Sequence, residues 1–342
     1  MIQNNPKVTI GLPVYNGEAC LGDALQSLLD QTYESFELII SDNASTDRTQ
    51  DICLDFAARD KRIRYIRQER NLGAIPNFNR VFEISDGDYF KWAAADDLCH
   101  PSYLGKCVAI LDSDIDVAWC HSRSSHIDSS GNLLSEAESQ DVSYADRQAE
   151  RPSHRFQAIL FSPHGCLDSY GLMRSAVVRK TPLYLPYYGP EKVFIAEMAL
   201  LGRYQEIPET LFFARVATGG SGSLLTAEEQ QAFIDTSSRR VPFTRLKFLQ
   251  GYLDAIHRCD LSFSEKMKCR ILVWRWVMQI AKWKSVLARA VSGRGVGGRN
   301  VDRLQQIKHR KEAAKTTDRP SNLALSSDQA SLNNDGSVAN EN

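Results

Sequence analysis

Two adjacent carboxylates, Asp96 and Asp97, stand directly after an apolar run and are the first residues that could do chemistry. Residues 89–95 are typical of a buried strand, which an α/β sheet covers on both faces. Ligands of such sheets bind beyond the carboxyl ends of the strands, where this pair lies. Adjacent carboxylates repel each other and are costly to bury, so a divalent cation is a natural occupant. Oxygen ligands suit Mg²⁺ or Mn²⁺ next to substrate phosphates; the alternative is that the pair only caps the following turn.

Strands and helices alternate along the first part of the chain, and they would have to position this pair. Apolar and β-branched runs predict strands at 7–13, 36–41 and 62–67, with Pro13 ending the first. Apolar residues at helical spacing predict helices at 19–31, 48–59 and 75–84. The alternation predicts a mostly parallel sheet flanked by helices, with polar strand ends gathered along one edge. This layout is typical of nucleotide binding, although neither GxGxxG after the first strand nor GxxxxGK[ST] is present.

The composition is that of an ordinary soluble protein, with 342 residues of which 43% are hydrophobic and 24% are charged. A net charge of −1 argues against a broad nucleic-acid-binding surface, so we expect no nucleic-acid partner. The eight cysteines form no CxxC motif and no secretory signal precedes them, which favours reduced thiols and a cytoplasmic location. No apolar run reaches the ~20 residues that span a bilayer.

Four motifs in a fixed order give the chain a family resemblance. They are Gly-Leu-Pro-Val-Tyr-Asn-Gly at 11–17, Ile-Ser-Asp-Asn-Ala-Ser-Thr-Asp at 40–47, Asn-Leu-Gly at 71–73 with Asn79, and Ala-Asp-Asp at 95–97. In this order and spacing, they resemble the family 2 inverting glycosyltransferases of the GT-A fold, of the type that builds bacterial polysaccharides of the cell envelope. The resemblance covers most of residues 7–216.

The resemblance implies a binding site for a nucleotide-sugar and a metal ion. The expected donor-binding residues are Pro13, Tyr15, Asn16, Glu18, Asp42, Asn71, Gly73, Asn79, Asp96 and Asp97, and the expected ligand of Mg²⁺ or Mn²⁺ is Asp96. The loop after Asp42 has a second interpretation, because Ser45 or Thr46 could simply cap the following helix. One departure concerns Ala94, which stands where many relatives have a further carboxylate. Mg²⁺ tolerates this loss because it keeps several waters; the alternative is a weakened or lost activity.

Inverting transfer also needs a base that takes the proton of the acceptor hydroxyl. In similar enzymes this is an acidic residue just before a helix, and the matching position is Glu191, ahead of a helix predicted at 193–201. A glutamate in a first helical turn is also favoured by the helix dipole alone. Glu197 is the rival acid, but its helical phase predicts a structural role. Arg215, at the end of the last predicted strand, could approach the diphosphate or form a surface salt bridge.

These observations predict three regions. Residues 1–218 would form the GT-A catalytic domain, with a nucleotide-sugar half (1–120) and an acceptor half (121–218); 219–292 would be a helical extension and 293–342 a disordered tail. In the extension, helices are predicted at 227–237, 244–257 and 264–291. The last mixes Trp with Lys and Arg, so it could lie on an anionic membrane surface or pack against the catalytic domain.

The sequence therefore predicts a metal-dependent inverting glycosyltransferase. It would move a sugar from a nucleotide-diphosphate sugar, expected to be a UDP-sugar, to a hydroxyl of a glycan or lipid-linked acceptor. It would work in the cytoplasm or on the cytoplasmic face of a membrane. Two alternatives stay open: a nucleotide-sugar-binding or assembly subunit that keeps the fold without turnover, and a nucleotidyl transferase that forms pyrophosphate.

Overall fold

The computed structural model describes residues 6–134, 145–162, 166–216, 234 and 244–279. The helix predicted at 227–237, apart from Ile234, lies outside these residues, as do the predicted tail and the end of the helix predicted at 264–291.

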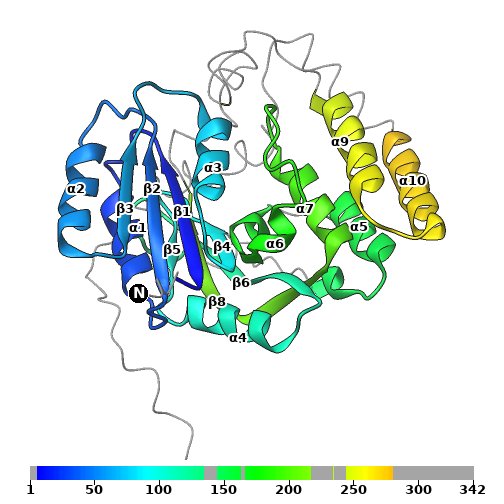
Figure 1. Ribbon diagram of the computed structural model, residues 1–342, viewed down its shortest axis with the longest axis horizontal. Helices are drawn as coiled ribbons and strands as arrows, with labels where there is room; N and C mark the ends of the chain where they lie inside the picture. The colour runs from blue at the N-terminus through cyan, green and yellow to red at the C-terminus, as the bar shows by residue number, and fades with distance from the viewer. Residues whose placement is uncertain (1–5, 135–144, 163–165, 217–233, 235–243, 280–342) are drawn as a thin grey trace, which may run out of the picture. The chain divides into compact units, whose positions relative to one another are not determined.

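The first half of the fold is the predicted alternation of strands and helices (Figure 1). Strands β1 (Val8–Val14), β2 (Phe36–Asp42), β3 (Ile63–Arg67) and β4 (Tyr89–Trp92) are parallel and lie in the order β3-β2-β1-β4. Helices α1 (Leu21–Leu29), α2 (Thr49–Arg59) and α3 (Ala74–Glu83) connect them. Since every residue of β1 is buried, this strand is at the centre of the core, and its carboxyl end points to the same edge as those of its neighbours.

Pro13 does not end the first strand, contrary to the prediction. It lies inside β1 and pairs with Ser41, and Val14 pairs with Asp42. Successive residues of a parallel strand bond to opposite neighbours, and Gly11 accepts from the Ala93 N–H on the β4 side at 2.9 Å. Pro13 faces that same side, where the pairing with β4 has already stopped. Its missing N–H is therefore not needed, and β1 continues.

In the second half of the sheet two strands, β7 (Leu172–Arg174) and β5 (Leu98–Cys99), run opposite to the others. The other strands of this half are β6 (Val117–Ile127) and β8 (Arg203–Arg215). The full order is β3-β2-β1-β4-β7-β6-β8-β5, with β7 antiparallel to β4 and β6, β5 antiparallel to β8, and β6 parallel to β8. The sheet is thus mixed, and the expected α/β class with flanking helices is confirmed.

Helices cover this half as well. They are α4 (Tyr103–Ser113), α5 (Pro152–Phe161), α6 (Ser175–Val178), α7 (Glu191–Leu201), α9 (Thr244–Arg258) and α10 (Phe263–Val277), with short 3₁₀ turns at Ala145–Gln148 and Leu167–Tyr170. Helix α7 is almost entirely buried and packs against α5 and α9, and α10 packs against α5 and α9 in turn. Helices α9 and α10 therefore share one hydrophobic core with the preceding part of the fold.

Candidate active site

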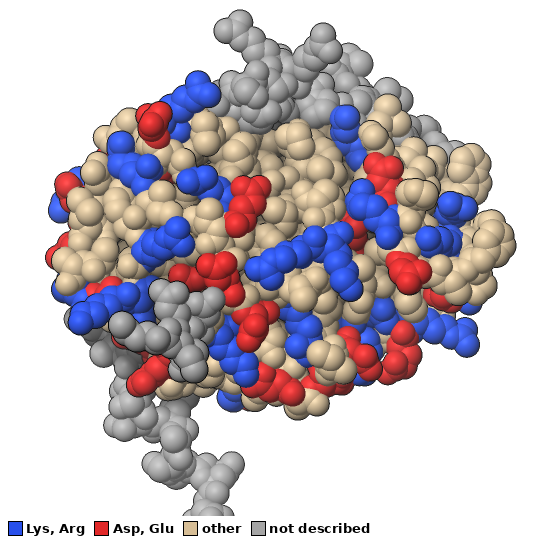
Figure 2. Space-filling model, in the orientation of Figure 1, with Lys and Arg blue, Asp and Glu red and all other residues tan. Residues whose placement is uncertain are grey.

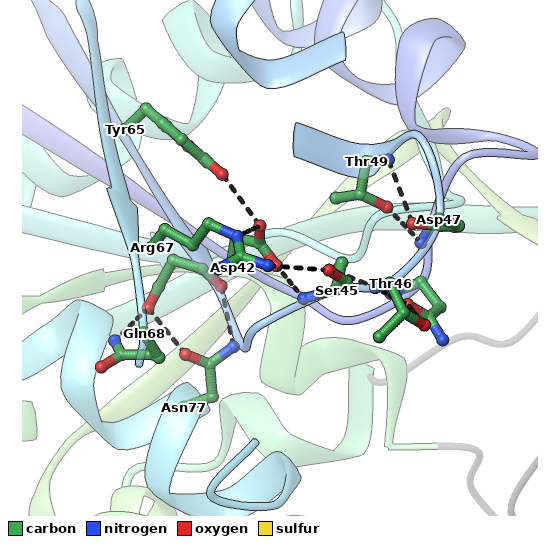
Figure 3. Close-up of polar contacts among 12 residues, drawn as sticks. Asp42, Ser45, Thr46, Asp47, Thr49, Tyr65, Arg67, Gln68 and Asn77 are labelled. Carbon is green, nitrogen blue, oxygen red and sulfur yellow. Dashed lines mark hydrogen bonds and ion pairs between the residues drawn. The ribbon is translucent and has the colours of Figure 1, made fainter. Parts of the chain in front are cut away.

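Asp42, the last residue of β2, is fully buried and forms the centre of a polar cluster (Figure 3). Its Oδ1 accepts a hydrogen bond from the Ser45 N–H at 2.8 Å, and its Oδ2 accepts one from the Tyr65 hydroxyl at 2.8 Å. Arg67 Nε lies 3.4 Å from the same Oδ2. Tyr65 and Arg67 both come from β3 and point toward the carboxylate in Figure 3. Asp42 thus holds the end of β2, its following loop and β3 in one arrangement. The predicted capping of the next helix by Ser45 or Thr46 is wrong, because α2 begins at Thr49 and its N-cap residue, Arg48, has no side-chain cap bond.

The loops after β1 and β2 are cross-linked by their own side chains. The Asn16 N–H donates to Ser45 Oγ at 2.9 Å, and Asn16 Oδ1 accepts from the Thr46 N–H at 2.8 Å. Glu18 Oε2 accepts from the Arg48 N–H at 3.0 Å, and the Glu18 N–H donates to Asp47 Oδ2 at 3.0 Å. Asn16 has φ +52°, a left-handed conformation that asparagine tolerates better than most residues. Tyr15 is exposed over 45% of its surface, while Pro13 is buried.

A third loop joins the same edge through three residues. Asn43 Nδ2 donates to Asn71 Oδ1 at 2.9 Å and to the Gly73 carbonyl at 3.0 Å, and its Oδ1 accepts from the Leu72 N–H at 2.9 Å. Gly73 has φ +92°, which glycine adopts without strain, and α3 begins directly after it. The predicted pair Asn71 and Gly73 is therefore brought to the end of β2, by Asn43, a residue that the sequence prediction did not select.

Asp96 and Asp97 are held by Arg215, the last residue of β8, which is distant from them in sequence. The Arg215 N–H donates to Asp97 Oδ1 at 2.9 Å, and its guanidinium Nε donates to the Asp96 carbonyl at 2.8 Å. The guanidinium also donates to the carbonyls of Asp128 and Ser129, at 3.2 and 2.9 Å. Arg215 is buried, so a surface salt bridge does not describe it, although its Nη2 also lies 3.4 Å from the exposed Asp23.

A buried lysine lies beneath this pair. Lys91, in β4, is 1% exposed, and its Nζ donates to the Tyr170 carbonyl at 2.5 Å and to the Trp92 carbonyl at 3.2 Å. The amine also lies 5.0 Å from the ring centroid of Tyr103 and 5.1 Å from that of Phe212. Sequence reasoning missed Lys91; the available signal was a lone charged residue inside an otherwise apolar strand.

The two carboxyl groups are electrostatically perturbed. Burial raises the pKa of Asp97, the Asp96 carboxylate raises it further, and together they bring the pKa to about 7, even though the charges of Lys91 and Arg215 oppose the shift. Burial also raises the pKa of Asp96. Strongly perturbed carboxyl groups of this kind are typical of functional sites.

Glu191 begins helix α7 and faces the same region. Burial raises its pKa above the ordinary glutamate value. After burial itself, the charges of Asp97, Asp96 and Glu191 all raise the pKa of one side chain, Tyr170. Such an influence requires proximity. All three carboxyl groups therefore lie within electrostatic range of Tyr170. The turn that carries Tyr170 contacts α7 and β4, and the Tyr170 ring stacks on Phe212 at a centroid distance of 6.1 Å.

The other two predicted residues have structural contacts. Glu197 is 1% exposed and accepts two hydrogen bonds from the Arg258 guanidinium, at 2.9 and 2.8 Å, which ties α7 to α9. Its predicted structural role agrees with this ion pair. Asn79 donates to the Tyr184 carbonyl at 2.9 Å and accepts from the Tyr184 N–H at 3.0 Å. Asn79 therefore fixes the segment that precedes α7, and both of its amide atoms face protein backbone.

The strand-end loops form a continuous edge from Asp42 to Asp96. Val14 lies beside Asp42 in the register of β1 and β2, and a Cβ atom at Gly17 would lie 3.5 Å from that of Ala95. The charge of Asp96 also raises the pKa of Cys20, at the start of α1, after the larger effect of burial. The predicted residues of the first, second and fourth strands thus lie along one edge, and Tyr170 lies within electrostatic range of both Asp96 at this edge and Glu191.

The donor set at this edge suits a hard divalent cation, although it is incomplete. Two carboxyl groups with raised pKa values gain from a positive charge, and their oxygens match Mg²⁺ or Mn²⁺. Within the described residues, no group of three or more His, Cys, Asp and Glu side chains could hold a metal ion. A cation would therefore take Asp96 as protein ligand and complete its shell with substrate phosphate and water.

Comparison with known proteins identifies the family. The sequence model described as Glycosyl transferase family 2 matches residues 9–180, half of the chain. The chain belongs to glycosyl transferase family 2. The resemblance found in the four motifs is thereby confirmed, and the match includes every predicted donor-binding residue but ends before Glu191.

Relatives of this family 2 chain carry glycosyltransferase names. It is 34% identical over 113 residues to an uncharacterized glycosyltransferase of Haemophilus influenzae, covering 33% of this chain and 35% of that protein. It is 36% identical over 98 residues to the glycosyltransferase GlyA of Streptococcus pneumoniae, covering 29% and 14%. The chain thus matches about a third or less of the length of these relatives.

Solved structures share the fold over a longer range. TarS 1–349 of S. aureus, in complex with UDP-GlcNAc, has a TM-score of 0.57 at 18% identity and covers 76% of this chain and 69% of its own. The mannosyltransferase PcManGT of Pyrobaculum calidifontis, in complex with GDP-Man and Mn²⁺, has a TM-score of 0.50 at 14% identity and covers 92% and 82%. At these identities the likeness establishes the fold.

Proposed function

We propose that this protein is a metal-dependent inverting glycosyltransferase that transfers a sugar from a nucleotide-diphosphate sugar, by preference a UDP-sugar, to a hydroxyl of a glycan or lipid-linked acceptor. The proposal is supported most by three carboxyl groups with raised pKa values, Asp96, Asp97 and Glu191, which all lie within electrostatic range of Tyr170. They combine an oxygen-rich edge that suits a cation and a diphosphate with a carboxylate that can act as base. The bound UDP-GlcNAc of TarS and the bound GDP-Man and Mn²⁺ of PcManGT are consistent with such a donor.

Each end of the site has its own task in this proposal. The loops around Asp42, Asn71 and Gly73 shape the nucleoside end, with Tyr15 as the exposed side chain available to the base. Asp96 would hold Mg²⁺ or Mn²⁺, which when bound would stabilise the negative charge that develops on the leaving diphosphate. Asp97, held by Arg215, positions the loop that carries Asp96.

Glu191 performs the proton transfer. Its carboxylate accepts the proton of the acceptor hydroxyl while the hydroxyl oxygen bonds to the anomeric carbon, and the bond from that carbon to the diphosphate oxygen breaks on the opposite face. Burial assists because a desolvated carboxylate with a raised pKa is a stronger base than one in water.

The test is a donor-hydrolysis assay that follows release of the nucleotide from a panel of UDP- and GDP-sugars with Mn²⁺ or Mg²⁺. We expect release that EDTA suppresses and that Asp96→Asn reduces at least about a hundredfold. Asp55→Asn is a matched control, because Asp55 lies on the exposed surface of α2. Full release in EDTA, or an active Asp96→Asn variant, would contradict the proposal.

Because Ala94 stands where many relatives have a carboxylate, one alternative stays open, a subunit that binds a nucleotide-sugar without turnover. The two functions separate in one pair of measurements. A binder would be stabilised by the donor in a thermal-shift assay, by ~2.7 kcal/mol at a hundred times the dissociation constant, and would release no nucleotide. A lipid-linked acceptor would place the enzyme at a membrane, and we propose that it works on the cytoplasmic face of one, as polysaccharide biosynthesis of the cell envelope requires.

A further inference from the structure

Helix α10 exposes a stripe of large apolar side chains. The stripe consists of Phe263, Met267, Ile271, Trp274 and Met278, which are 78%, 39%, 54%, 66% and 55% exposed. Successive members are three or four residues apart, so they share one face of the helix. The opposite face is formed by Cys269, Leu272, Val273 and Trp276, which are buried where the helix packs against α5 and α9. Packing in the core therefore accounts for the buried apolar face of α10 but not for its exposed stripe.

Positive charges flank the stripe. Lys268, Arg270 and Arg275 are all exposed. The single carboxylate of α10, Glu265, accepts hydrogen bonds from the Ser153 N–H and from Lys268 Nζ, at 2.9 and 2.8 Å, so its charge is already matched. In Figure 2, the edge at which α9 and α10 lie carries blue and red side chains among tan ones. The exposed face of α10 thus combines apolar bulk, aromatic rings and cations.

We infer that this stripe is a docking surface for an anionic lipid bilayer and lies in its headgroup region. Amphipathic helices with this combination bind at the membrane interface, where Trp is favoured and Lys or Arg attracts anionic headgroups. None of the helices in the described ranges has the length and apolar character of a membrane span, so α10 would lie along the interface. The stripe would be the surface that holds the protein at the membrane location proposed above. Its role does not depend on the chemistry proposed at Glu191.

Charge favours an anionic membrane over two other candidate partners of the stripe, which are a second copy of the chain and the segment that follows α10 in sequence. A second copy that packed stripe against stripe would bring the same cations, Arg270 and Arg275, toward each other. The segment that follows in sequence, 280–319, contains eleven Lys and Arg against three Asp and Glu, and 320–342 adds three Asp and Glu. The whole of 280–342 therefore keeps a positive net charge and does not complement the cations beside the stripe. An anionic surface matches both the stripe and its flanking cations.

The experiment is co-flotation of the full-length chain with vesicles of phosphatidylcholine, alone or mixed with phosphatidylglycerol. We expect binding to the anionic vesicles that weakens with added salt and little binding to the neutral ones. The double variant Ile271→Asp/Trp274→Asp should bind roughly tenfold or more weakly, as should Arg270→Gln/Arg275→Gln. Ile115→Asp is the matched control, because Ile115 is 79% exposed outside α10 and should leave vesicle binding unchanged.

Several results would overturn the inference. One is equal binding of the stripe variant and the wild type, which would assign the membrane contact to the basic segment 280–319. Another is a wild-type dimer in light scattering that Ile271→Asp/Trp274→Asp converts to monomer, which would assign the stripe to a second copy. A third is a wild type that binds neither vesicle. Donor hydrolysis in the stripe variant should stay at the wild-type rate, so failure of this inference and failure of the proposed chemistry give different results.

Discussion

The two glutamates of α7 allow a paired test of the assigned base, because the same substitution should affect activity at one position and stability at the other. Glu191 begins the helix beside Tyr170, whereas Glu197 is bound by the guanidinium of Arg258. Glutamine preserves the size and helical propensity of either side chain but removes the charge. Glu191→Gln and Glu197→Gln are therefore matched variants, and each serves as the control for the other.

For Glu191→Gln we expect a loss of kcat of about 10²- to 10⁴-fold, the usual contribution of a general base. This corresponds to about 3–5 kcal/mol in the activation barrier. Its stability should not fall. Because burial raises the pKa of Glu191 in the folded state, the folded wild type binds more protons than the unfolded chain as the pH rises above the ordinary glutamate value. The wild type thus loses stability through that window, and the variant does not.

For Glu197→Gln we expect a loss of unfolding free energy instead. Removing one member of a fully buried ion pair costs about 3–5 kcal/mol. Here the Arg258 side chain is 36% exposed and can turn to water, so we expect about 1–3 kcal/mol. The kcat of the folded variant should stay within about threefold of the wild type, since no reacting atom contacts Glu197 in this scheme.

Urea unfolding at pH 5 and pH 8, together with kcat and KM for nucleotide release onto an acceptor, measures both effects. In the wild type, kcat/KM should fall on the acidic side at a pH above the ordinary glutamate value, because the base must be deprotonated and its pKa is raised. That acidic limb should be absent from the residual activity of Glu191→Gln. An active Glu191→Gln variant, or an inactive Glu197→Gln variant of wild-type stability, would refute the assignment.

Two further predictions concern the residues that hold the site. Tyr65→Phe removes the hydroxyl that donates to the buried carboxylate of Asp42, so we expect about 1–3 kcal/mol lower stability in urea unfolding. We also expect a higher KM for the donor. An unchanged donor KM would show that the Asp42 cluster does not shape the nucleoside end of the site. Arg215→Lys keeps the charge but cannot reproduce the several bonds of the guanidinium, so metal-stimulated donor hydrolysis should fall at least about tenfold, whereas Asp23→Asn, which alters only the exposed partner, should have little effect.

The first half of the fold was predictable because its signals are local. The apolar runs of β1 to β4 and the helical spacing in α1 to α3 are each contained in a dozen residues or fewer. The long strand β6 has no such local signal beyond Cys120, because its continuation contains His121, Ser122 and Ser124. These polar residues are buried, and the His121 ring bonds the Tyr103 hydroxyl at 2.6 Å. That burial depends on a partner in another element, which no local pattern reveals.

The site residues divide in the same way. The carboxylates were predictable, since a charged residue that follows an apolar run is visible in the sequence. The strand itself is shorter than predicted, because β4 ends at Trp92 and not at residue 95. Lys91 was missed, and Arg215 was selected without its role as the residue that holds Asp96 and Asp97, because the partners of both lie far along the chain. The motif residues Asn16 and Asn79 were selected as donor contacts, yet in the fold their side chains bond to Thr46 and Tyr184. A motif thus marks the residues that build a site as well as those that touch a ligand.

The charges around the carboxylate pair bear on the carboxylate that Ala94 lacks. Asp96 and Asp97 already repel each other, and Lys91 and Arg215 bring two positive charges, which lower the pKa of Asp97 against the effect of burial. A third carboxylate at position 94 would add a negative charge to a pair that these two cations already match. With alanine at position 94, the summed charge of the carboxylate pair and its two cations is close to zero before any ligand binds. A divalent cation and a diphosphate carry opposite charges, so binding both together changes this sum little. The site is therefore electrostatically suited to take up the cation with the donor rather than to bind it tightly on its own.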